Sequence, residues 1–133
     1  MIIKAYTGYE LVKAQPNTSE DYFNRSEVTY INDGMERTLH VLYIRYFEEQ
    51  LQEFTPFEGN PVFKLEGRDV TFKEIAALLC LVNCPAFANR KRIYINTIEE
   101  FRTYIDSKTV QRVQEIIEQL HKGIEPSLAN HIA

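Results

Sequence analysis

The sequence predicts an α+β fold, with antiparallel strands mainly in the N-terminal half packed against helices mainly from the C-terminal half. Short segments rich in Val, Ile and Tyr, separated by turn residues, fill the first half. The second half carries helix-capping patterns followed by apolar residues at helical spacing. The expected helices span approximately 72–82, 98–105 and 108–122. With 133 residues, 44% of them hydrophobic, the chain is expected to form a single domain, 1–133.

The first segments have strand composition. Ile2–Tyr6 is predicted as a strand, with Thr7-Gly8 as a turn into a second strand over 9–14. The capping-box spacing of Thr7 and Glu10 leaves a helix start as the alternative. Glu27–Ile31 is the next predicted strand. The Asn32-Asp33-Gly34 segment after it predicts a hairpin turn, because these residues tolerate positive φ.

The middle of the chain is less determined. Arg37–Tyr46 alternates as a strand would, but its apolar residues also fit one face of a helix. The preceding turn and the β-branched residues favour a strand, followed by a helix to Phe54. A loop with two prolines and a glycine is expected over 55–61, and a strand over 62–65.

Capping patterns mark the helices of the second half. Thr71 and Glu74 have capping-box spacing, as do Thr97 and Glu100. Pro85 disfavours helical geometry in the preceding residue and therefore predicts a helix end at Cys84.

The last helix carries an apolar seam, with residues spaced alternately by three and four. It includes Val110, Val113, Ile117 and Leu120. The favoured interpretation is that this helix packs on the domain's own sheet, and the alternative is a homodimer through the C-terminal helix. Gly123 predicts the end of the helix, and residues 127–133 are expected to form a loose tail.

Residues 71–92 resemble a helix-turn-helix at its start. Thr71, Glu74-Ile75-Ala76 and Leu79 match that pattern, although Cys80 stands where a glycine is common. A second helix beginning at Pro85 would present a short polar and basic group to a macromolecule. This group is Asn89, Arg90, Lys91 and Arg92. The net charge of −4 argues against a general affinity for nucleic acid phosphates.

Catalytic, metal and cofactor patterns are absent from the sequence. The three histidines are scattered, and Cys80 and Cys84 lack zinc-ligand spacing. No glycine-rich phosphate loop or nucleophile elbow is present. We therefore expect no enzyme, no metal and no cofactor. A cysteine-dependent enzyme built on Cys84 and a distant histidine such as His40 or His121 is a distant third hypothesis.

The leading expectation is a small, non-catalytic binding protein of the adaptor, inhibitor or immunity type. Its partner is expected to be another protein, and a DNA-binding regulator using residues 71–92 is the alternative. Tyr9, Tyr22 and Tyr94 lie in or near expected loops and are candidate interface residues, because interface cores favour aromatic side chains. The two cysteines and the polar start of the chain predict a reducing, cytoplasmic location, and the apolar stretch Ile75–Val82 is too short to span a bilayer.

Overall fold

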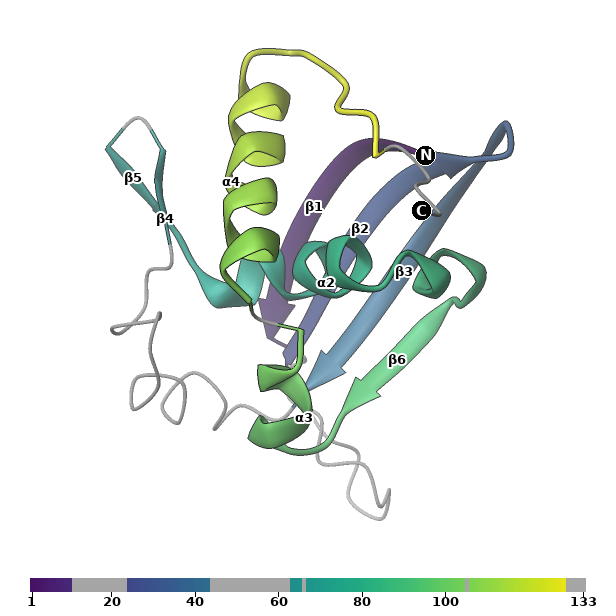
Figure 1. The fold of residues 1–133 in the computed structure, drawn as a ribbon, viewed down its shortest axis with the longest axis vertical. Helices are drawn as coiled ribbons and strands as arrows, with labels where there is room; N and C mark the ends of the chain where they lie inside the picture. Colours follow the sequence, from purple (N-terminus) through teal and green to yellow (C-terminus); the bar gives the residue numbers. More distant parts are fainter. Residues whose placement is uncertain (11–23, 44–62, 66, 105, 129–133) are drawn as a thin grey trace.

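The computed structural model describes residues 1–10, 24–43, 63–65, 67–104 and 106–128, and the structural statements below concern these residues. They form a mixed α+β fold. A four-stranded, mostly antiparallel sheet, built largely from the N-terminal half, packs against helices from the C-terminal half (Figure 1). This confirms the predicted fold class.

Three strands of the sheet are antiparallel neighbours, and a fourth joins β3 in parallel. In spatial order they are β1 (Ile2–Glu10), β2 (Asn24–Asn32), β3 (Met35–Tyr43) and β6 (Arg92–Ile95). A separate two-stranded ribbon consists of β4 (Phe63–Leu65) and β5 (Arg68–Val70). The sheet thus takes its first three strands from one contiguous part of the sequence and its last from a distant part.

The β2–β3 hairpin forms where the sequence predicts it. Asp33 and Gly34 both have positive φ, 52° and 75°, and Asn32 pairs with Met35. Two positive φ angles in a two-residue loop match the twist of the flanking strands. The segment 37–46 fits either a strand or a helix in the sequence, and the structure shows that it belongs to strand β3 as far as Tyr43. Residues 44–46, the loop expected over 55–61 and the helix expected before it lie outside the described residues.

The predicted turn at Thr7-Gly8 was wrong, because β1 runs without a break through both residues. A different structural requirement explains the glycine at position 8. A Cβ built on Gly8 would lie 1.6 Å from the carbonyl oxygen of Lys73, which belongs to the first turn of α2 (Phe72–Asn83). Only a residue without a side chain allows the helix backbone to approach the strand this closely.

One face of the sheet is covered by α2, which lies across β1 and β2 (Figure 1). Every residue from Ile75 to Leu81 is fully buried in this helix. After α2 come a short 3₁₀ helix, η1 (Pro85–Asn89), α3 (Ile98–Arg102) and α4 (Ser107–His121). The core therefore lies between the α2 layer and the inward side chains of the sheet.

Side-chain caps begin α3 and α4 but not α2. The Thr97 hydroxyl accepts a hydrogen bond from the Glu100 amide at 3.1 Å, and the Asp106 carboxylate accepts one from the Thr109 amide at 2.8 Å. Thr71 is the N-cap residue of α2, but its side chain makes no capping hydrogen bond. Its backbone carbonyl instead accepts a hydrogen bond from the Glu74 amide. The predicted helix start is correct, and the predicted side-chain cap is not formed.

The chain after α4 is tied to β1. Gly123, at φ +79°, ends the helix, and the Ile124 amide donates back to the Gln119 carbonyl at 2.9 Å. The Leu128 amide then donates to the Met1 carbonyl at 2.7 Å. Ser127 forms a bridge with Ile2. Residues 127 and 128 are thus held against β1, and residues 129–133 of the expected loose tail lie outside the described residues.

Candidate binding site

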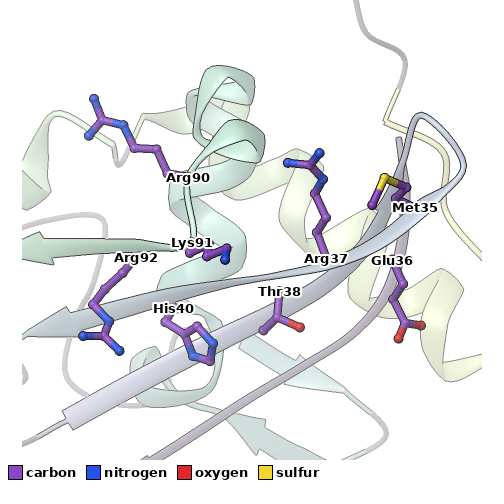
Figure 2. A pocket seen from close by; sticks show the side chains of 8 residues that line it. All are labelled: Met35, Glu36, Arg37, Thr38, His40, Arg90, Lys91 and Arg92. Carbon is purple, nitrogen blue, oxygen red and sulfur yellow. The ribbon is translucent and has the colours of Figure 1, made fainter.

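An open pocket of about 740 Å³ lies at the end of the sheet where β3 extends past the start of β6. Figure 2 shows its lining residues, which we call the basic pocket. They are Met35, Glu36, Arg37, Thr38, His40, Arg90, Lys91 and Arg92. The lining holds three arginines and a lysine but one carboxylate, so the pocket carries positive charge in a chain whose net charge is −4.

Two segments that are distant in sequence build the pocket. Arg37 comes from β3, just after the hairpin turn, and the basic run comes from the connection between η1 and β6. A buried hydrogen bond fixes that connection, because the Tyr30 hydroxyl on β2 donates to the Ala88 carbonyl in η1 at 2.9 Å. Burial raises the pKa of Tyr30, and the Arg37 charge partly opposes that rise. The Tyr30 hydroxyl therefore stays protonated and available as a donor.

Side chains of β3 alternate between the two sides of the sheet. Met35 and Arg37 lie on the side of α2, as the buried core residues of the strand do, and Glu36, Thr38 and His40 lie on the other side (Figure 2). A chain segment entering the pocket would therefore meet different chemistry on its two sides.

The cations of the basic pocket are open to solvent. Arg37, Arg90, Lys91 and Arg92 are all exposed. The Arg90 guanidinium lies 5.5 Å from the centroid of the Phe87 ring, a cation–π distance that orients the side chain. Arg37, Arg90 and Lys91 form no ion pair with any carboxylate of the described residues. Their charge is therefore available to a ligand.

His40 differs from these cations because a carboxylate lies beside it. Its Nδ1 is 3.1 Å from Oε1 of Glu27, its cross-strand partner on β2. Arg25 Nη2 lies 3.5 Å from the same oxygen. The Glu27 carboxylate thus lies beside two basic groups, so His40, unlike Arg37, Arg90 and Lys91, has an acidic neighbour within the described chain.

The sequence-predicted binding residues divide into two groups. Arg90, Lys91 and Arg92 line the pocket, whereas Asn89 is exposed at the end of η1 and is not among its lining residues. Tyr94 is half-buried, and its hydroxyl accepts a hydrogen bond from Arg92 Nη1 at 3.2 Å.

The side chains of two candidate aromatic residues are not described, and one cation of the pocket was not predicted. Tyr22 lies outside the described residues, and the side chain of Tyr9 is not described. Arg37 joins the site although the sequence gives no sign of it, because only the strand pairing brings β3 beside the basic run.

The second helix of the expected helix-turn-helix is not formed. Residues 85–89 make a five-residue 3₁₀ helix, and the chain then enters β6 at Arg92. Ile93 and Ile95 alternate inward as strand residues and pair with Val41 and Tyr43 on β3. This inward alternation favours a strand, so the described residues 85–95 form a 3₁₀ helix and a strand in place of the expected second helix.

The C-terminal seam packs within its own chain, but mainly against α2 and less against the sheet that was expected to receive it. Val113 and Ile117 are buried, and Val110 and Leu120 are partly buried against the core. α4 contacts α2 and β1. The four seam residues proposed for a homodimer interface are therefore used to hold α4 to its own chain.

The cysteines are unbridged and differ in exposure. Cys80 is buried, which raises the pKa of its thiol, and Cys84 is partly exposed at the end of α2. His40 lies across the sheet from α2. Asp106, at the start of α4, accepts a hydrogen bond from Asn83, the residue before Cys84. His121 is the last residue of the same helix and therefore lies at its other end. The described histidines thus lie apart from the Cys84 thiol.

Other features of the described ranges limit the site chemistry further. Within them, no three His, Cys, Asp or Glu residues are grouped to hold a metal ion. Among the helices that the structure describes, none has both the length and the apolar content to cross a membrane. No family model, curated protein or solved structure matches this chain.

Proposed function

We propose that this chain is a non-catalytic binding protein that recognises an acidic segment of another protein at the basic pocket. One observation carries the proposal. Arg37 from β3 and the run Arg90-Lys91-Arg92 converge on one pocket, although the chain as a whole has a net charge of −4. Exposed cations gathered from separate segments form a local positive field that attracts an anionic partner and orients it.

Several features favour a protein partner over duplex DNA. The second helix needed to enter a major groove is missing from residues 85–92. The cations surround a pocket of about 740 Å³, which suits a single chain segment. A duplex longer than the pocket would also lie against a chain whose net charge is −4. Unbridged Cys80 and Cys84 support the further proposal that the protein works in the reducing cytoplasm.

The test uses a defined probe, an eight-residue peptide that alternates glutamate and threonine, with blocked ends and a fluorescent label. Binding is measured by anisotropy for the wild type and for the double variant Arg90→Gln with Lys91→Gln. Each exposed ion pair contributes about 0.2–1 kcal/mol, so losing two should weaken binding by roughly two- to thirtyfold.

A charge-matched control separates the pocket from the overall charge. The control variant is Lys108→Gln with Lys122→Gln. Both lysines are exposed, one within α4 and the other at its C-cap position. The control changes the net charge from −4 to −6, as the pocket variant does. The control should bind as the wild type does. Equal weakening in both variants, or tighter binding of a twelve-base-pair duplex than of the peptide, would overturn the proposed function.

A further inference from the structure

The basic pocket contains a stretch of sheet edge that no described strand covers. β3 has nine residues and β6 has four. The register pairs His40 with Arg92 and continues only toward the C-terminal ends of both strands. The stretch of β3 from Met35 to Leu39 therefore has β2 on one side and the pocket on the other.

Backbone groups on this stretch point into the pocket. The His40 amide donates to the Lys91 carbonyl at 2.9 Å, so it points away from β2. The directions of the backbone amides alternate along a strand, and the β2–β3 register has no bulge. The amides of Thr38 and Glu36 therefore point away from β2, as the His40 amide does. In the part of the chain that the structure describes, the peptide groups of these two residues meet no hydrogen-bond partner.

The two sides of this edge specify the side chains of an added strand. Side chains of such a strand alternate between the two sides of the sheet. On the α2 side they would meet Arg37 and, toward η1, Arg90 (Figure 2). On the opposite side they would meet the Glu36 carboxylate and Thr38. His40 and Arg92 also lie on that side, but only where β6 begins, and Arg92 there donates to the Tyr94 hydroxyl. Beside Glu36 and Thr38, carboxylates therefore suit the positions that face the α2 side, and neutral side chains suit the positions between them.

We propose that the acidic partner segment binds as an extended strand added to the free edge of β3 at Glu36 and Thr38, with an acidic side chain at every second position facing Arg37 and Arg90. Main-chain hydrogen bonds to the sheet edge give such a complex its affinity, and the alternating side chains give it specificity. This inference rests on the proposed function and adds the binding mode.

The first experiment asks which peptide amides are needed. Two analogues of the glutamate–threonine octapeptide are compared, one N-methylated at every glutamate and one at every threonine. Only one set of amides can face β3, because successive residues of a strand point to opposite edges. One analogue should lose about tenfold or more in affinity. The other should stay within about threefold of the parent peptide.

Two results would overturn strand addition while leaving the proposed function standing. If both analogues bind as tightly as the parent, side chains alone hold the peptide. If both lose affinity equally, the peptide does not use one edge. By contrast, a parent peptide whose binding does not respond to Arg90→Gln with Lys91→Gln removes the proposed function itself.

The second experiment observes the protein edge directly by amide hydrogen exchange in the NMR spectrum. In the free protein the Glu36 and Thr38 amides should exchange rapidly, whereas the Leu39 amide, which points to β2, should be protected. Saturating peptide should slow exchange at Glu36 and Thr38 by about tenfold or more and leave Leu39 unchanged. Unchanged exchange at both edge amides in the complex would refute the proposed strand addition.

Discussion

Gly8 offers the sharpest test of how α2 sits on the sheet. In Gly8→Ala the new Cβ would lie 1.6 Å from the Lys73 carbonyl oxygen, 2.4 Å from the Lys73 carbonyl carbon and 3.0 Å from the Glu74 Cα. All three are backbone atoms, so no side chain can rotate away. Restoring an ordinary contact of about 3.4 Å requires α2 to move away from β1 by roughly 2 Å.

Such a displacement acts on the most buried helix of the described chain. The residues from Ile75 to Leu81 are fully buried, and a gap of even 0.5–1 Å loses a quarter to a half of a contact's dispersion energy. Overpacking usually costs about 1–3 kcal/mol, and a backbone clash belongs at or above the upper end. We therefore expect Gly8→Ala to lower the free energy of unfolding by about 3 kcal/mol or more.

Urea denaturation followed by circular dichroism measures this change, with two controls. Thr7→Ala alters the exposed neighbour on the same strand and should change stability by at most about 0.5 kcal/mol. Gly34→Ala places a Cβ in open space at φ +75° and should cost only about 1–2 kcal/mol, from backbone strain. A Gly8→Ala variant as stable as the Thr7 control would show that the helix does not contact β1 in this way.

Two further predictions concern the helix layer. Asp106→Ala removes the N-cap of α4 and should cost about 1 kcal/mol, while Asp106→Asn keeps the cap. The hydrogen bond from the Thr109 amide lowers the pKa of Asp106, so its charge stabilises the fold above about pH 4 and loses that effect as the pH falls through the lowered pKa. In urea titrations the wild type should therefore lose its advantage over Asp106→Asn in acid, and a constant difference would contradict this. Tyr30→Phe leaves the Ala88 carbonyl without its donor and should lower the free energy of unfolding by about 1–3 kcal/mol, whereas unchanged stability would show that water replaces the hydroxyl.

Local chemistry explains the parts of the fold that the sequence predicts. The turn at Asp33-Gly34 depends on residues that tolerate positive φ, and the capping of α3 and α4 depends on side chains within one helical turn. Gly8 fails as a turn signal because its cause is the approach of α2, which lies much later in the sequence. Whether a glycine serves conformation or close packing depends on tertiary structure, which a single sequence pattern does not contain.

The candidate site is likewise predictable from the sequence only where the signal is local. The run from Arg90 to Arg92 is visible in the sequence because its three charges are consecutive. Arg37 is not, because it joins the run only through the parallel pairing of β3 with β6. The helix-turn-helix resemblance failed after Pro85, where the inward-facing Ile93 and Ile95 favour a strand over a second helix.

The basic run also explains why the sheet edge is left open. Lys91 lies just before β6, two residues before Ile93. If it were part of the strand, its side chain would point to the same side of the sheet as Ile93 and Ile95, which face the core. Extending β6 backward to cover Thr38 would turn Lys91 toward the helix layer, where Ala88 is already buried and bonded to Tyr30. Burying an unpaired ammonium group is costly, so β6 starts only after the lysine. The same residues that stop β6 from covering β3 therefore place positive charge beside the edge that they leave free.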